Sequence, residues 1–220
     1  MSEAPISEVT VSEVTPDLIA ELYLRAEPYW HTRSGEIHMP QAYAYAQALL
    51  RAHPEASAGT VLAAILLHDV GYARVPEETH HQGLADAPSG WQPDITRLHE
   101  QEGVKLAREL LSELRYPAAL VGPILTIIGG HDSTSGEAHS LEDAIVKDAD
   151  KLWRFGARGV EICRGWMGMT FEDFTAYVEA KIPTWFHTAE GARLARLTLD
   201  RARREHRETE PGETEHRETP

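Results

Sequence analysis

Four histidines of this 220-residue chain lie in phase with apolar side chains at the spacing of an α-helix. His68 follows Ala64 by four residues, and His131 closes a stripe of isoleucines. His38 and His99 each begin a similar stripe. Because residues three or four positions apart share one face of a helix, all four imidazoles are predicted to point into the protein interior.

These imidazoles, together with the carboxylate of Asp69, could bind a metal ion. A single such histidine is most often a satisfied core residue, but burying four imidazoles and a carboxylate without partners would cost several kcal/mol. A shared cation removes this cost, because neutral imidazole nitrogen and carboxylate oxygen are ligands of Zn, Fe, Mn and Co. The sequence therefore predicts a metal site whose ligands come from separate helices.

A further acidic ligand could come from the segment Lys147-Asp148-Ala149-Asp150-Lys151. Side chains two positions apart on a helix point about 200° apart, so only one of the two aspartates can face the core. Asp148 and Asp150 both continue apolar stripes, and the periodicity leaves the choice between them open.

The elements that must position these side chains are helical almost throughout the chain. Thr15, Pro16 and Asp17 form a typical helix start, with a capping hydroxyl, a first-turn proline and an acid at the positive dipole end. Later helices are expected at about 38–53, 58–71, 94–115, 117–130, 141–155, 171–182 and 189–204, with a loop at 73–93. This pattern predicts an all-α, single-domain helical bundle.

The two ends are expected to lie outside this bundle. Residues 1–15 contain a short near-repeat and are predicted to form a flexible arm. Residues 205–220 contain a second near-repeat and no apolar residue after Ala202, so they cannot repay the entropy of ordering and are predicted to be a disordered tail. The domain is therefore expected to span 16–204.

The composition excludes several classes of function. With 21 basic and 35 acidic residues the formal net charge is −14, which argues against binding of a nucleic-acid duplex. A small anionic substrate stays compatible, because a bound metal reverses the charge locally. Cys163 is the single cysteine, so the chain cannot form an internal disulfide. No apolar run is long enough to span a membrane, and no signal peptide is recognisable at the amino terminus. These features lead us to expect a cytoplasmic location.

Three elements together resemble the HD-domain superfamily of metal-dependent phosphohydrolases. They are His38, the segment Ala63-Ala-Ile-Leu-Leu-His68-Asp69-Val-Gly71 and the box Ala149-Asp150-Lys-Leu152. The resemblance covers about 36–155 and implies a helical fold with extra C-terminal helices. It also implies that His38, His68, Asp69 and Asp150 hold a divalent metal, and it alone favours Asp150 over Asp148.

His99 and His131 stand where the dinuclear branches of this superfamily carry two additional histidines. If both bind, the resemblance implies two ions bridged by Asp69, with His38, His68 and Asp150 on one ion and His99 and His131 on the other. The alternative is one ion, with His99 and His131 near the substrate. Fe, Mn, Co, Ni and Zn are not distinguished, and His80 and His81 in the 73–93 loop compete with His99 as ligands.

The resemblance implies a phosphohydrolase that acts on a small phosphate ester or nucleotide. The candidate catalytic residues are Asp69, Asp132 and Lys151. Asp132 either orients the neighbouring imidazole, acts as a proton shuttle or caps a helix. Candidates for the cationic groups that bind the anion are Lys147, Lys151, Arg154, His31 and Arg33, and a surface ion pair is the equal alternative for each. Tyr72 stands where some branches of the superfamily carry Lys, and the absence of this Lys weakens the case for a polyphosphate substrate. A mixed-valent di-iron oxygenase is therefore the alternative function. A binding or regulatory protein with a structural metal is the third. The helices at 171–182 and 189–204 either pack across the core or form a homodimer surface.

Overall fold

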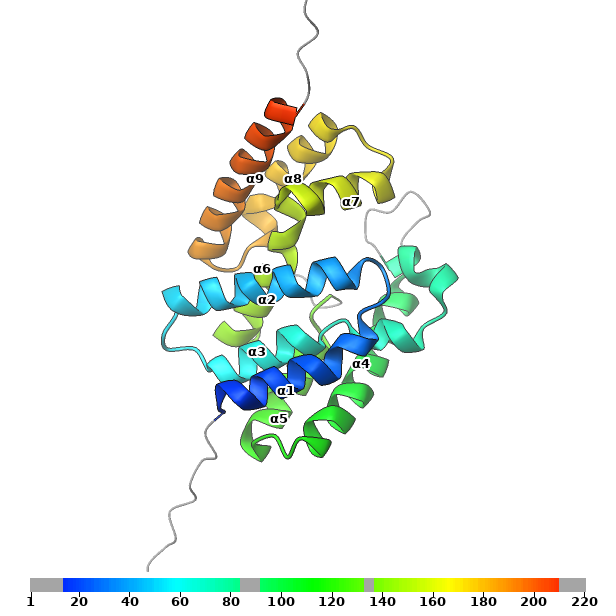
Figure 1. Cartoon of the computed structure of the whole chain (residues 1–220), viewed down its shortest axis with the longest axis vertical. Coiled ribbons are helices and arrows are strands. Elements are labelled where there is room, and N and C mark those ends of the chain that lie inside the picture. Colours follow the sequence, from blue (N-terminus) through cyan, green and yellow to red (C-terminus); the bar gives the residue numbers. More distant parts are fainter. Residues whose placement is uncertain (1–13, 84–91, 133–136, 210–220) are drawn as a thin grey trace, which may run out of the picture.

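The computed structural model describes residues 14–83, 92–132 and 137–209, and within these ranges the regular structure is helical, with no strand (Figure 1). The α-helices are α1 (Pro16–Ala26), α2 (Gly35–Ala52), α3 (Ala58–Leu67), α4 (Pro93–Glu113), α5 (Ala118–Ile128), α6 (Leu141–Leu152), α7 (Ala157–Met167), α8 (Phe171–Trp185) and α9 (Ala189–Thr209). Short 3-10 helices are η1 (Glu27–Tyr29), η2 (Val70–Arg74), η3 (Glu77–Gly83) and η4 (Trp153–Phe155). The all-α prediction is confirmed.

Side-chain caps set the starts of several helices. The hydroxyl of Thr15 accepts a hydrogen bond from the backbone N–H of Leu18 at 3.2 Å, so α1 begins at the predicted residue. Ser57, Ser140 and Thr170 cap α3, α6 and α8 in the same way. Each cap satisfies a backbone donor that the first helical turn leaves unpaired.

Helix α3 lies at the centre of the bundle. It packs against α1, α2, α5 and α6, and the side chains from Ala63 to Leu67 are fully buried. This explains why its sequence is apolar on every face rather than on one stripe. His68 and Asp69 follow directly at its carboxyl end, so the doublet is held inside the protein.

A close crossing of two backbones fixes the segment after the doublet. A side chain at Gly71 would meet the carbonyl oxygen of His99 and the backbone of Gly103. Glycine is therefore required for η2 to lie directly against α4. The crossing brings the helix that carries His99 next to Asp69.

Helices α7, α8 and α9 form a second layer that α6 joins to the first (Figure 1). Sequence periodicity misses α7, because this helix buries only Gly159, Val160 and Cys163 and contains arginines on its other faces. The loop expected at 73–93 contains the short helix η3 and the last residues of η2. Helix α3 ends at Leu67, so the helix expected at 58–71 is interrupted before η2 begins at Val70.

The ends differ in part from the expectation. Helix α9 continues to Thr209, so the first residues of the predicted disordered tail are helical. His206, which was expected to have no fixed geometry, stacks on Phe171 with ring centroids 3.6 Å apart. Residues 1–13, which are most of the predicted arm, and residues 210–220 lie outside the described residues. Among the described helices, none has the length and apolar character needed to cross a bilayer.

Candidate metal centre

Side chains from three helices meet in a first group of candidate metal ligands. His38 comes from α2, His68 from the end of α3 and Asp150 from α6. The Nε2 atoms of the two histidines lie 3.1 Å apart, and Oδ1 of Asp150 lies 3.3 Å from His38 and 3.5 Å from His68. Oδ2 of Asp69 completes the group, at 3.7 Å and 3.5 Å from the same nitrogens.

A second group lies beside the first. His99 comes from α4, and His131 and Asp132 follow α5. The two Nε2 atoms are 3.4 Å apart, and Oδ2 of Asp132 lies 3.6 Å from His99 and 3.8 Å from His131. Oδ1 of Asp69 lies 3.9 Å and 3.4 Å from these nitrogens. Asp69 thus presents one carboxylate oxygen to each group.

The tautomers of two histidines are fixed by the backbone. Nδ1–H of His68 donates to the carbonyl of Ile65 at 2.8 Å, and Nδ1–H of His131 donates to the carbonyl of Ile128 at 2.9 Å. In the neutral imidazoles Nε2 then carries a lone pair. This arrangement is typical of histidines that bind metal, because the bond to Nδ1 orients the ring.

The residues fit a bound cation. Two buried Nε2 lone pairs at 3.1 Å or 3.4 Å repel each other unless a proton or a cation lies between them. Imidazole nitrogens and carboxylate oxygens converge at both places, and this donor set suits Zn, Fe, Mn or Co. Each group could therefore hold one divalent cation.

Burial and mutual charge perturb the titration of these side chains strongly. Burial and the charge of His131 lower the pKa of His99 to about 4. Burial acts in the same direction on the pKa of His131, but the carboxylates of Asp132 and Asp69 outweigh it and raise that pKa to about 10. The imidazoles hold the pKa of Asp69 well below its usual range against the effect of burial. The carboxylates are therefore ionised and available as ligands at neutral pH.

The geometry separates Asp148 from Asp150. Asp150 joins the first group, whereas Asp148 accepts hydrogen bonds from the backbone N–H groups of His187 and Thr188 at 2.8 Å and 2.9 Å. It also accepts one from the Thr188 hydroxyl at 2.7 Å. Asp148 thus secures the start of α9, and periodicity could not distinguish the two aspartates because both are buried.

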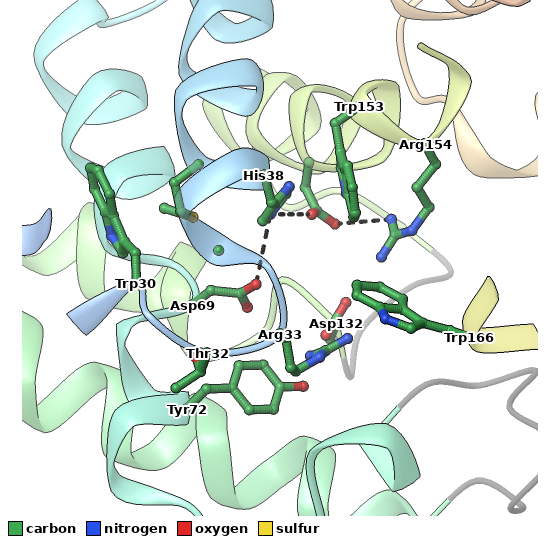
Figure 2. Close-up of a pocket in the computed structure, with 13 residues that line it drawn as sticks. Trp30, Thr32, Arg33, His38, Asp69, Tyr72, Asp132, Trp153, Arg154 and Trp166 are labelled. Carbon is green, nitrogen blue, oxygen red and sulfur yellow. Dashed lines mark ion pairs between the residues drawn. The ribbon is translucent and has the colours of Figure 1, made fainter. Parts of the chain in front are cut away.

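The other sequence candidates fall into two sets. Arg33 and Arg154 line a pocket next to the two groups, together with Asp132 and Tyr72 (Figure 2). Lys147 is buried in an ion pair with Asp143, at 3.0 Å. His31 is exposed, and the half-buried Lys151 does not line the pocket.

His80 does not join either group. Its Nε2–H donates to the carbonyl of Val75 at 2.9 Å, and its ring contacts the edge of Tyr72 at 5.2 Å between centroids. Tyr72 in turn stacks on His99, with centroids 4.1 Å apart. His80 therefore packs against Tyr72, which in turn packs against the candidate ligand His99. The side chain of His81 lies outside the described residues.

Sequence reasoning missed Glu100. This residue is buried, and its carboxylate accepts a hydrogen bond from the backbone N–H of Asp132 at 3.0 Å. The contact ties the segment after α5 to α4 and so orients the second group. Its one sequence signal is an acid directly after an inward-facing histidine, which is too common to be informative.

These observations define a helical protein with a buried cluster of histidines and aspartates that could hold divalent cations. The family profile of the HD domain matches residues 35–154, more than half of the chain, and the chain belongs to this family. Proteins with this domain are generally metal-dependent hydrolases. Comparisons with curated proteins and with solved structures returned no match.

Proposed function

We propose that the protein is a metal-dependent phosphohydrolase that acts on a small phosphate ester or nucleotide. The observation that carries the proposal is the position of Asp69 between the two groups of candidate ligands. One of its carboxylate oxygens faces the first group, and the other faces the second. Two cations held in this way would lower the pKa of a coordinated water and neutralise charge on phosphoryl oxygens.

We assign ligand roles in two sets that share Asp69. His38, His68 and Asp150 hold the first cation, and His99, His131 and Asp132 hold the second. The backbone carbonyls of Ile65 and Ile128 keep two of the imidazoles in the tautomer that binds. Asp132 also lines the pocket. Its Oδ2 faces the imidazoles of His99 and His131, and in this proposal its other carboxylate oxygen accepts a proton from the attacking water.

The family relationship and the pocket support this proposal together. HD-domain proteins are generally hydrolases, and the pocket beside the ligands contains two guanidinium groups suited to a substrate anion. Lys151, half-buried on α6, acts in this proposal only through its charge, because it does not line the pocket.

The test combines metal content with product analysis. Purified protein loaded with Mn²⁺, Co²⁺, Ni²⁺ or Zn²⁺ is expected to release phosphate from aryl phosphates or nucleotides, and chelation should abolish the release. Activity that instead requires iron, O₂ and a reductant would refute the hydrolase and support the oxygenase alternative.

The number of cations is tested with a matched pair of histidine variants. His99→Ala is expected to lower the bound metal from about two to about one per chain, as measured by elemental analysis, because it removes a ligand of the second group. His80→Ala removes a buried histidine that belongs to neither group and should leave the stoichiometry unchanged. Full metal content in His99→Ala would contradict the second site.

A further inference from the structure

Several buried hydrogen-bond donors in the pocket have no partner. Within the described part of the chain, Nε–H of Arg33, the hydroxyl of Tyr72 and Nε1–H of Trp153 donate to no acceptor atom. All three residues line the pocket beside the two ligand groups. Because buried polar groups in proteins are nearly always paired, unmet donors that share one pocket indicate a ligand rich in acceptor atoms.

Two guanidinium groups line this pocket. Arg33 lies over the ring of Tyr72, 4.3 Å from its centroid. Nη1 of Arg154 lies 3.7 Å from Oδ2 of Asp150, which is too long for a hydrogen bond. Figure 2 shows the side chain of Arg33 between Tyr72 and Asp132, and the side chain of Arg154 entering beside Trp153.

The backbone that presents Arg33 is held in an unusual conformation. Arg33 and Ser34 have φ angles of 50° and 59°, a region that residues with a side chain seldom adopt. The segment is closed tightly, because a side chain at Gly35 would collide with the carbonyl of Trp30. Trp30 is itself anchored by a hydrogen bond from its indole N–H to the carbonyl of Leu66, at 3.2 Å. Such backbone conformations concentrate where a side chain must be presented for function.

The charge of the pocket also favours an anion. Its lining includes the carboxylates of Asp69, Asp132 and Asp150 and the guanidiniums of Arg33 and Arg154. With two divalent cations and neutral imidazoles, the pocket has a net charge of roughly +3. A ligand with two negative charges would compensate most of this excess.

We propose that Arg33, Tyr72 and Arg154 form an anion subsite that binds the non-bridging oxygens of a terminal, doubly charged phosphoryl group. The proposal deepens the hydrolase assignment and rests on it, since the cations complete the same pocket. The three side chains come from the segment before α2, from η2 and from η4, so separate parts of the chain contribute to the subsite. The subsite therefore selects phosphate monoesters over diesters, which carry a single charge.

Binding of inorganic phosphate to the Mn²⁺-loaded protein tests this subsite without relying on turnover. We expect Arg33→Gln and Arg154→Gln each to weaken phosphate binding by about 10- to 100-fold in isothermal titration calorimetry, because each removes a charge-assisted hydrogen bond. Tyr72→Phe should weaken binding by a smaller factor, and Arg33→Lys should restore part of the loss. Arg201→Gln, a change in an exposed ion pair with Glu205, is the control and should leave binding unchanged.

The outcomes separate the subsite from the hydrolase assignment. Metal content is measured for every variant. Because Arg154 lies beside the proposed ligand Asp150, Arg154→Gln could lose metal, and the result for Arg33→Gln then decides the test. Phosphate binding that depends on the arginines in a protein that hydrolyses no ester would refute the hydrolase and leave the subsite standing. Unchanged phosphate affinity in Arg33→Gln at full metal content would overturn the subsite, even if esters are hydrolysed.

Discussion

Asp148 and Asp150 lie two positions apart on α6 and face different parts of the protein. Asp148 accepts three hydrogen bonds at the start of α9, and Asp150 faces His38 and His68. We expect Asp148→Ala to lower the free energy of unfolding by about 1–3 kcal/mol, because it leaves buried donors unpaired. Asp150→Ala should instead lose metal. Denaturant unfolding and metal analysis of both variants check this, and the reverse pattern would show that the two roles are exchanged.

Cys163 on α7 is a buried thiol. Burial raises its pKa to about 11, although Arg154 and Arg33 act to lower it. Because only the thiolate reacts readily, the folded protein should resist thiol reagents at pH 8 and react fully once unfolded. The same pKa shift makes the free energy of unfolding depend on pH. As the pH rises above about 8.5, the unfolded chain loses the thiol proton before the folded protein does, so the contribution of Cys163 to the free energy of unfolding decreases.

A thiol-reagent assay at several pH values, with and without denaturant, checks this behaviour. Rapid stoichiometric modification of the native protein at pH 8 would contradict the burial of Cys163.

At the scale of elements, the crossing of η2 and α4 depends on Gly71. Gly71→Ala is expected to lower the free energy of unfolding by about 3 kcal/mol, because the added methyl group meets the backbone of His99 and Gly103. It should also weaken metal binding, since the displaced helix carries His99.

A second glycine provides the matched control for this variant. Gly165 lies in α7, and a side chain there meets nothing within 4 Å. Gly165→Ala should raise the free energy of unfolding by about 0.5–1 kcal/mol, because alanine loses less backbone entropy in a helix. Equal effects of the two substitutions in denaturant unfolding would show that the crossing tolerates a side chain.

At the scale of the whole molecule, the proposed cations link helices that are distant in the sequence. Their ligands come from α2, α4 and α6 and from the segments that follow α3 and α5. A cation at 100 times its dissociation constant adds about 2.7 kcal/mol of stability. Removal of metal should therefore lower the Tm by about 5–10 °C for a chain of this size.

Differential scanning calorimetry before and after chelation measures this shift. The double variant His38→Ala/His99→Ala, which lacks a ligand in each group, should show a Tm that is insensitive to chelation. A wild-type Tm that is equally insensitive would contradict a metal shared between the helices.

Much of the fold and part of the site could be predicted from local patterns. Thr15 and Pro16 predicted the start of α1, and the phase of His38, His68, His99 and His131 with apolar residues predicted burial, which the structure confirms. Such features depend on helical period and capping alone. Helix α7 was missed because most of its surface is polar or glycine, so its period is weak.

Other features arise only from tertiary contacts. Asp150 points toward the histidines because of the way α6 packs against α2 and α3. Asp148 is also buried, but against the start of α9. Glu100 contacts Asp132 across 32 positions of sequence. No local pattern in a single sequence encodes such a pairing, and the unmet donors of Arg33, Tyr72 and Trp153 are visible only once the pocket is formed.

The position of His68 and Asp69 directly after the buried residues Ala63–Leu67 of α3 has a consequence for how such a protein can diversify. A substitution along α3 disturbs the packing of the interior and both ligand groups together. The guanidiniums of Arg33 and Arg154 come instead from the segment before α2 and from η4, outside that central helix. Substitutions in those two segments can change which substrate the pocket binds, while the metal ligands and the buried interior around α3 stay the same.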